Sequence, residues 1–310
     1  MAMSKKKGTT PPKKHHFVPV TYLKRFTDHN GQLHCFDRQS GIFTKTLPKA
    51  IMAVNKFYRQ DWAPAGTDPN ILEITLGQWL EPGAKNSLDR LIQSPTLLTE
   101  EDTCILVLYL EFQRIRVPRQ VEMAKELIKD MIMRLGPQDI MSEVREGKFS
   151  LNMNNSVRFE YVKMAMGEFY PWFETMEWEV IEAENDAAFI TSDSPLSLYN
   201  PEIPPPAEAG IGLAGTMVFF PLSSRYVLLM RHSGVRDRAD FSNLLPLPDP
   251  LNSDTMISIT HGAIWSADVV NNFNWKMLRL SERFIVAERL ETLQACIEID
   301  DLKGRIVERA

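Results

Sequence analysis

Two adjacent histidines near the start of the chain are candidates for acid–base or metal chemistry. An imidazole titrates near neutral pH, so His15 or His16 can act as a general base or bind a metal ion. Neighbouring residues of an extended segment point to opposite sides, so we expect one histidine in the site and the other in a hydrogen bond that fixes the turn. The alternative is that both cap or pack beneath the helix that follows.

Asp193 is the candidate carboxylate of the C-terminal half. It follows a predicted strand that ends in FITS, and it precedes Pro195. A carboxylate at a strand end is well placed for metal binding or acid–base catalysis. The alternative is structural, because Ser192, Asp193 and Ser194 all favour turns, and an aspartate can cap a turn through its own side chain.

Three arginines, Arg114, Arg116 and Arg119, gather near Pro118 at a predicted helix end. Their guanidinium groups can hold a phosphate or a carboxylate through two parallel hydrogen bonds. They also suit the negative end of a helix dipole, which is the alternative explanation. We select Arg116 because it falls within a motif described below.

Two glutamates add to these candidates. Glu73 and Glu81 are separated by just over two helical turns, so they lie on about the same face, where glutamates are most often solvated. In the functional interpretation Glu73 joins His16 and Asp193 as a ligand of a divalent metal that activates water, and Arg116 holds a phosphate. The catalytic candidates are His15, His16, Asp193 and Arg116, and the metal-ligand candidates are His16, Asp193 and Glu73.

The elements expected around the histidines are short. Apolar residues of the segment 15–26 recur at helical spacing, and Pro19 suits a first helical turn, so a short helix is expected just after His16. Residues 32–47 form two alternating runs around Ser40-Gly41, a pattern that predicts a β-hairpin.

The middle of the chain has helical periodicity. A helix is predicted over 71–92, which Pro82 should kink or divide. A second helix begins at Thr99, with Asp102 in a capping-box position, and ends near Pro118. Further helical patterns cover residues 119–135 and 157–173.

Strands gather in the C-terminal half. The alternating run 177–183 predicts a strand, three more strands are predicted at 187–193, 217–222 and 225–231, and a final strand at 283–289 follows a helical pattern over 252–280. This separation favours an α+β fold, with a helical middle and a mostly antiparallel sheet that the N-terminal hairpin can complete. We divide the chain into a flexible basic arm, 1–14, and a single α+β domain, 15–310, with a soft internal boundary near residue 175.

The composition is that of an ordinary globular protein: 44% of the residues are hydrophobic and 24% are charged. The net charge of −5 disfavours a general nucleic-acid binder, although the lysine-rich arm offers contacts to phosphates. Three separated cysteines favour a reducing compartment, and no targeting or membrane-spanning segment is visible, so we expect a cytoplasmic protein. The sequence has no P-loop, dinucleotide-binding or nucleophile-elbow motif, which disfavours ATP-driven, nicotinamide and α/β-hydrolase chemistry.

The segment HHFVPVTYLKRF at residues 15–26 resembles the opening signature of a bacterial family known as domain of unknown function 4238, roughly H-H-x-V-P-x-x-Y-L-x-x-F. Ser194 stands where that family often has Asn. The resemblance implies one architecture and a bacterial or phage-related origin, and it supplies no reaction. The later landmarks that are similar are Gly31, Leu33 and Asp37, then Glu73 and Glu81, then Gln113, Arg116 and Pro118, then Thr191, Ser192, Asp193 and Pro195, then 221–223, and last Asn271 and Asn274.

Two functions follow as hypotheses. The first is a metal-assisted hydrolase or nuclease that acts on a nucleic acid or another phosphate-bearing substrate. The second is a non-enzymatic module that binds a ligand or a protein partner, for instance in a bacterial defence system, with the histidines and the TSD turn structural. A nucleic-acid binder that uses the lysine arm is a third, weaker hypothesis.

Overall fold

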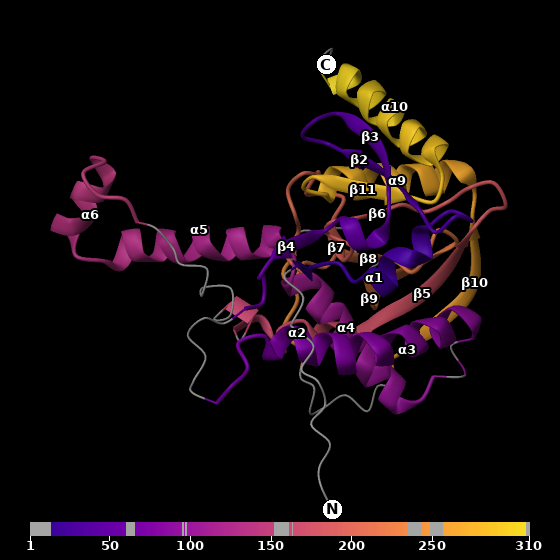
Figure 1. Cartoon of the computed structure of the whole chain (residues 1–310), viewed down its shortest axis with the longest axis horizontal. Coiled ribbons are helices and arrows are strands. Elements are labelled where there is room, and N and C mark those ends of the chain that lie inside the picture. The colour runs from indigo at the N-terminus through magenta and orange to yellow at the C-terminus, as the bar shows by residue number, and fades with distance from the viewer. Residues whose placement is uncertain are drawn as a thin grey trace, which may run out of the picture.

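Strands from both ends of the chain meet in one sheet, and helices surround the strands (Figure 1). The computed structural model describes residues 14–59, 66–94, 96, 98–151, 161–162, 164–234, 243–248 and 257–307. Within these residues the fold is α+β, as predicted. No helix in the described part of the chain is long and apolar enough to span a bilayer.

A five-stranded sheet forms the centre of the fold. Its strand order is β10–β5–β9–β8–β7, and every pair except β10–β5 is antiparallel, so the predicted antiparallel sheet of the C-terminal half is confirmed. The strands are β5 (Met176–Ala183), β7 (Ser197–Tyr199), β8 (Met217–Pro221), β9 (Tyr226–His232) and β10 (Ile259–Trp265).

Both faces of this sheet are buried, because successive side chains of a strand point to opposite sides. Val180 and Phe220 belong to a hydrophobic core that also contains Leu106 of the helical middle. Ile181 and Phe219 belong to a second core on the other face. Burial on both faces explains why the strands read as continuous apolar runs such as MVFF and VLLM.

The N-terminal hairpin lies in a second, four-stranded sheet. β2 (Leu33–Asp37) and β3 (Ile42–Thr46) pair around Gly41, whose φ of +70° suits glycine in a tight turn. β2 pairs with β11 (Phe284–Ala287), and β11 pairs with β6 (Thr191–Ser192). The hairpin therefore joins strands of the C-terminal half, as predicted, but it does not extend the central sheet.

The middle of the chain is helical. A π-helical turn, Leu76–Leu80, separates α2 from α3, and Pro82 lies in the first turn of α3, so the predicted division of this helix occurs here. The helices are α2 (Ile71–Thr75), α3 (Glu81–Gln93), α4 (Glu100–Ile115), α5 (Pro118–Leu135), α6 (Gln138–Arg145) and α8 (Tyr170–Thr175).

The histidine-bearing segment begins with a strand pair. β1 (Lys14–His16) is antiparallel to β4 (Ala53–Asn55), with His15 opposite Val54. α1 (Val20–Leu23) then follows Pro19, as the sequence predicts.

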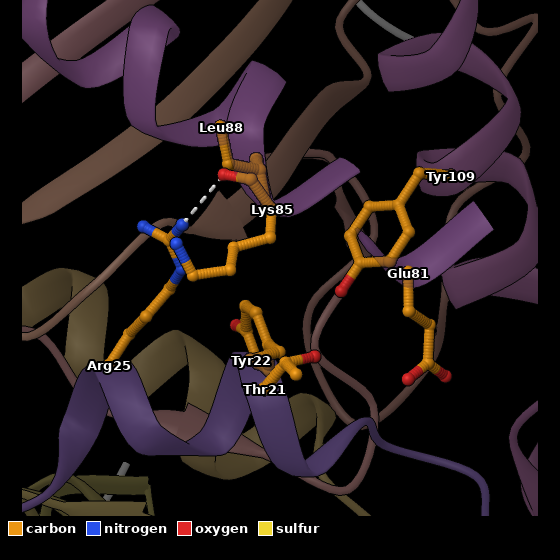
Figure 2. Close-up of a pocket in the computed structure, with 7 residues that line it drawn as sticks. All are labelled: Thr21, Tyr22, Arg25, Glu81, Lys85, Leu88 and Tyr109. Carbon is orange, nitrogen blue, oxygen red and sulfur yellow. Dashed lines mark hydrogen bonds between the residues drawn. The ribbon is translucent and has the colours of Figure 1, made fainter. Parts of the chain in front are cut away.

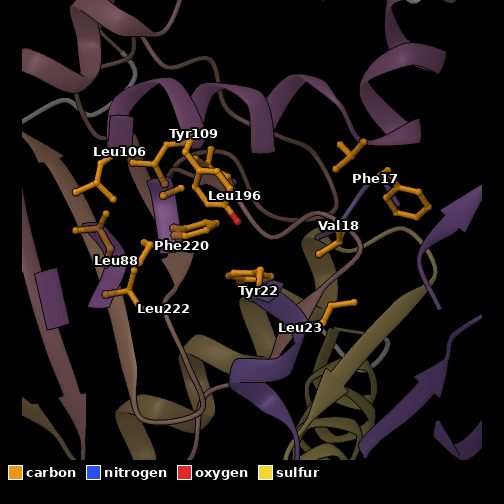
Figure 3. Packing of buried hydrophobic residues seen from close by; sticks show 14 of the residues in the cluster. Phe17, Val18, Tyr22, Leu23, Leu88, Leu106, Tyr109, Leu196, Phe220 and Leu222 are labelled. Carbon is orange, nitrogen blue, oxygen red and sulfur yellow. The ribbon is translucent and has the colours of Figure 1, made fainter. Parts of the chain in front are cut away.

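α1 is anchored between α4 and the central sheet through Tyr22 (Figure 3). The Tyr22 ring stacks on Phe220 with centroids 5.2 Å apart. Its hydroxyl donates to the carbonyl oxygen of Pro221 and lies 2.8 Å from the hydroxyl of Thr191. The site-bearing N-terminal segment is thereby tied to both sheets.

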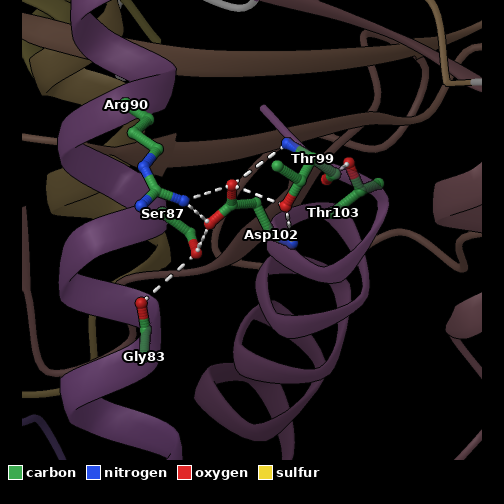
Figure 4. A network of polar contacts seen from close by, with 6 residues as sticks. All are labelled: Gly83, Ser87, Arg90, Thr99, Asp102 and Thr103. Atoms are coloured by element: carbon green, nitrogen blue, oxygen red, sulfur yellow. Dashed lines mark hydrogen bonds and ion pairs between the residues drawn. The ribbon is translucent and has the colours of Figure 1, made fainter. Parts of the chain in front are cut away.

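Two side chains of α3 and the N-cap residue of α4 meet at Asp102 (Figure 4). The Thr99 side chain accepts from the Asp102 backbone, and the Asp102 carboxylate accepts from the Thr99 backbone, which is the predicted capping box. The same carboxylate accepts from Ser87 at 2.7 Å and forms an ion pair with Arg90 at 2.5 Å. Asp102 therefore fixes the angle at which α4 leaves α3.

The helix predicted over 252–280 is wrong in its first part, where the structure has a strand. β10 (Ile259–Trp265) precedes α9 (Ala267–Leu280), because the β-branched and aromatic residues of β10 pair with β5 over a long sequence distance. α10 (Leu290–Val307) closes the described chain and was not predicted. Residues 251–256, and residues 157–160 and 163 of the helix predicted over 157–173, lie outside the described residues.

Candidate functional site

The guanidinium of Arg116 forms the centre of a buried polar cluster. Arg116 follows the last residue of α4, and 2% of it is exposed. Its Nε donates to the carbonyl oxygen of Phe17 at 2.7 Å, and its Nη1 donates to Glu81 at 3.3 Å. Its Nη2 has no hydrogen-bond partner among the described residues. A buried guanidinium with an open amino group is suited to binding an oxyanion.

Gln113 lies one helical turn before Arg116, so the two side chains leave α4 on the same side. It is fully buried, and neither its amide nitrogen nor its amide oxygen has a partner in the described part of the chain. Buried amides are almost always paired, and an unpaired one costs about 1–3 kcal/mol. Two buried polar groups without a partner in the described part of the chain therefore lie on the same side of the end of α4.

His15 has a positioning role in this geometry. Its ring is fully buried and stacks on Tyr58, and its Nδ1 accepts a hydrogen bond from the Tyr58 backbone N–H at 2.9 Å. A neutral imidazole that accepts at Nδ1 carries its proton at Nε2. His15 thereby links β1 to the segment after β4, which is the turn-fixing role expected for one of the two histidines.

His16 points to the other side of β1 and is half-buried. Its Nε2 lies 3.2 Å from the carbonyl oxygen of Lys49, and a carbonyl can only accept, so Nε2 carries the proton and Nδ1 is the basic nitrogen. Burial lowers the pKa of His16, and nearby Arg116 lowers it further, while Glu81 opposes both. The ring is therefore neutral, and able to accept a proton, at neutral pH.

Glu73 of α2 is the second titratable group beside the guanidinium. Burial raises the pKa of Glu73 to about 7, Glu81 adds to the rise, and Arg116 opposes it. Arg116 and Glu81 act electrostatically on both His16 and Glu73, so the four side chains belong to one neighbourhood, although they come from β1, α2, α3 and the end of α4. A carboxyl group with a raised pKa near an imidazole with a lowered pKa is typical of acid–base catalysis.

Glu81 also faces a narrow pocket between α1 and α3 (Figure 2). Arg25 and Lys85 line this pocket, together with Tyr109 of α4. The site at Arg116 thus reaches the surface through the half-buried side chains of His16, Glu73 and Glu81.

Asp193 does not belong to this cluster. Its two carboxylate oxygens accept hydrogen bonds from the backbone N–H groups of Glu282, Arg283 and Phe284, at 3.0, 2.7 and 2.8 Å. Burial raises the pKa of the Asp193 carboxyl, and the three amide donors oppose the rise. The carboxylate therefore caps the start of β11, which is the structural alternative considered for it.

The predicted metal set is corrected by this geometry. Asp193 is occupied at β11 rather than placed beside His16 and Glu73. Among the residues that the structure describes, no three His, Cys, Asp or Glu side chains are grouped so as to hold a metal ion. A site for a divalent metal made of His16, Asp193 and Glu73 is therefore not formed.

Two residues of the cluster were missed as site residues, although the sequence carries a signal for each. Glu81 shares a helix face with Glu73, and Gln113 opens the Q-x-x-R-x-P element that contains Arg116. Of the lysine arm, Lys14 is the first residue of β1, and the lysines before it lie outside the described residues.

A comparison with protein families decides the affiliation of the chain. The profile of the family described as Protein of unknown function (DUF4238) matches residues 14–290. The chain belongs to this family. The DUF4238 match includes β1, the Arg116 cluster and the Asp193 cap, so the whole site lies within the family region. No curated protein and no solved structure matches the chain.

Proposed function

We propose that the chain is a hydrolase for a phosphate-bearing substrate, in which Arg116 and Gln113 hold the phosphate oxygens and His16 and Glu73 transfer protons. The observation that carries this proposal is the open Nη2 of Arg116, whose guanidinium is held by Phe17 and Glu81, together with the open amide of Gln113 one helical turn earlier. Fixed donors in a water-poor site stabilise charge that develops in a transition state.

The chemistry divides between the two titratable groups. Nδ1 of His16 takes a proton from a water molecule, whose oxygen forms the new bond to phosphorus. The bond from phosphorus to the leaving oxygen breaks, and Glu73 in its protonated form gives its proton to that oxygen. The neutral forms of both side chains are available together near neutral pH, as their pKa shifts require.

The decisive experiment measures hydrolysis of single-stranded DNA, single-stranded RNA and bis(para-nitrophenyl) phosphate by the wild type and two variants. We expect turnover of at least one substrate, and a loss of about a hundredfold or more in His16→Gln. His261→Gln is the matched control, because His261 also lies within hydrogen-bond distance of a backbone carbonyl, that of Ile92. Absence of turnover by the wild type, or equal loss in both variants, would contradict the proposal.

Binding to a protein partner is the second candidate function, and one separate observation favours it. α5 and α6 extend away from the body of the protein (Figure 1), and α5 carries an apolar row at every fourth position. The exposed fractions are Met123 49%, Leu127 63%, Met131 50% and Leu135 81%. Ion pairs within α5 neutralise its flanking charges, so the row suits an apolar partner such as the same row of a second copy.

Sedimentation equilibrium tests this second candidate. We expect the wild type to self-associate and Leu127→Lys to remain monomeric. A monomeric wild type at high concentration would exclude the second copy as the partner.

A further inference from the structure

The π-helical turn Leu76–Leu80 lies between the two glutamates of the site, Glu73 and Glu81. The Glu81 N–H donates to the carbonyl oxygen of Leu76, five residues earlier, whereas an α-helix bonds each N–H to the residue four earlier. The turn therefore holds one residue more than an α-turn. The segments on either side of it, α2 and α3, are regular α-helices.

The wider turn brings Glu73 and Glu81 onto one face of the helix. In a regular α-helix each residue turns by about 100°, so two residues eight positions apart are offset by about 80° around the axis. Because the π turn absorbs one residue, the two glutamates are offset by only about 20°, as residues seven positions apart would be. The electrostatics agree: Arg116 donates to Glu81 at 3.3 Å, and although burial chiefly raises the pKa of Glu73, the charges of Arg116 and Glu81 also act on it.

Core packing does not require the extra width of this turn. Leu76 and Leu80 are both buried, but they are four positions apart, so a regular α-helix would also place them on one face. The other three residues of the turn, Gly77, Gln78 and Trp79, are exposed. A methyl group placed on Gly77 would meet no atom of the described residues within 4 Å, apart from its chain neighbours and the helix backbone. The additional residue is therefore accommodated on the solvent side.

Pro82, in the first turn of α3, gives the wider turn a local cause. In a continuous α-helix, residue 82 would donate to the carbonyl oxygen of Gln78, but proline has no N–H and its ring clashes with that carbonyl. Irregular turns of helices have identifiable causes of this kind, and a wider turn directly before the proline relieves the clash. The proline thereby determines the rotation of α2 relative to α3.

We propose that Pro82 is a positioning residue of the acid–base site. Through the π turn it aligns Glu73 with Glu81, so that both carboxyl groups lie near Arg116. This inference rests on the proposed function, in which Glu73 is the acid. Without the π turn, Glu73 would be rotated by about 100° around the helix axis, which is the angle of one residue. Its carboxyl group would then leave the buried neighbourhood of Arg116.

Two measurements on the full chain test this role: the pKa of Glu73 and the rate of hydrolysis at pH 7. Carbon-13 NMR of the glutamate carboxyl groups gives the pKa, and the Glu73 signal is the one absent in Glu73→Gln. Pro82→Ala supplies an N–H and removes the ring, so the helix can close as a regular α-helix. We expect the pKa of Glu73 to fall from about 7 toward its ordinary 4.5. Hydrolysis at pH 7 should fall about a hundredfold, because the acid is then almost entirely ionised.

A second variant distinguishes loss of alignment from general damage to the fold. It deletes Gly77 from the Pro82→Ala protein. The two glutamates are then seven positions apart in a regular α-helix, which restores their offset of about 20°. We expect this double variant to recover the raised pKa of Glu73 and most of the hydrolysis. Pro171→Ala is the matched control, because Pro171 also lies in the first turn of a helix, α8, and its loss should change neither measurement.

The outcomes separate this inference from the proposed function. A pKa of Glu73 that stays near 7 in Pro82→Ala, while hydrolysis still depends on Glu73, would overturn the inference and leave the proposed function standing. A lowered pKa that the deletion of Gly77 does not restore would also overturn the inference, because damage to the fold would then explain the change. A pKa that falls and recovers as expected, in a protein without hydrolysis, would support the alignment by Pro82 and overturn the proposed function.

Discussion

Nε of Arg116 donates a hydrogen bond to the carbonyl oxygen of Phe17, 2.7 Å away and 99 residues earlier in the chain. This bond fixes the end of α4 against the residue that directly follows the two histidines. Together with the Nη1 bond to Glu81, it orients the plane of the guanidinium and thereby the open Nη2 amino group. The position of His16 beside Arg116 thus follows from a hydrogen bond to the backbone rather than to either histidine ring.

Gln113→Leu should separate stability from function. The amide of Gln113 is buried without a partner among the described residues, so an apolar side chain of similar volume removes an unpaired group. We expect the free energy of unfolding to rise by about 1 kcal/mol while hydrolysis falls at least tenfold. Urea unfolding and the phosphoester assay measure the two effects. A destabilised Gln113→Leu variant would mean that the amide is structurally satisfied and does not await a ligand.

The two histidines should respond differently to substitution. His15 is fully buried and accepts from the Tyr58 backbone, so His15→Ala should cost about 2–4 kcal/mol of stability. His16 is half-buried and donates to the carbonyl oxygen of Lys49, so His16→Gln should change stability by less than about 1 kcal/mol while turnover falls about a hundredfold or more. Thermal unfolding monitored beside the hydrolysis assay tests this division. Equal stability losses in the two variants would argue against it.

Asp193→Asn should damage the fold and spare the chemistry. The carboxylate accepts three backbone N–H groups at the start of β11, and an amide nitrogen placed there repels at least one of them. We expect a loss of about 2–4 kcal/mol in stability. Below the melting temperature of the variant, kcat should be that of the wild type. A folded Asp193→Asn variant with no activity would show that Asp193 has a catalytic role.

Asp102 should make the stability of the fold depend on acid pH. Burial alone would raise the pKa of Asp102, but hydrogen bonds from the Thr99 backbone, Ser87 and Arg90 outweigh it and hold the pKa well below its usual range. The folded pKa lies below the unfolded one, so the stabilisation is present above about pH 4 and disappears as the pH falls through the folded pKa. Asp102→Asn should be less stable by about 2 kcal/mol at pH 7, and the difference should shrink in acid. Urea unfolding at several pH values measures this dependence, and a difference that stayed constant with pH would refute it.

Local patterns were sufficient for several elements of the fold. The hairpin at 33–46 and the α4 cap at Thr99 depend on turn and capping residues that lie within a few positions of each other. The alternation of His15 and His16 follows directly from extended backbone, and the structure places one ring on Tyr58 and the other near Glu81. These features depend on short-range geometry, which a sequence records.

Long-range contacts explain what the sequence did not reveal. The turn residues around Asp193 fit a catalytic or a capping role equally well, and only the N–H groups of residues 282–284 distinguish them. β10 has helical spacing of its own, and its pairing with β5 decides its conformation. The helical spacing of Glu81 and Glu73 indicated two solvated glutamates. The bond from Arg116 to Glu81 joins residues 35 positions apart, so no local pattern predicts it.

The pH–rate profile of hydrolysis tests the acid–base pair at Arg116 most directly. His16 must be neutral to accept a proton, so activity should rise through its pKa, which burial holds below the ordinary 6.5. Glu73 must be protonated to donate, so activity should fall above its pKa of about 7. We predict a bell-shaped profile whose alkaline limb disappears in Glu73→Gln and persists in the exposed-residue control Glu126→Gln. A profile with both limbs unchanged in Glu73→Gln would contradict the assignment of Glu73 as the acid of this site.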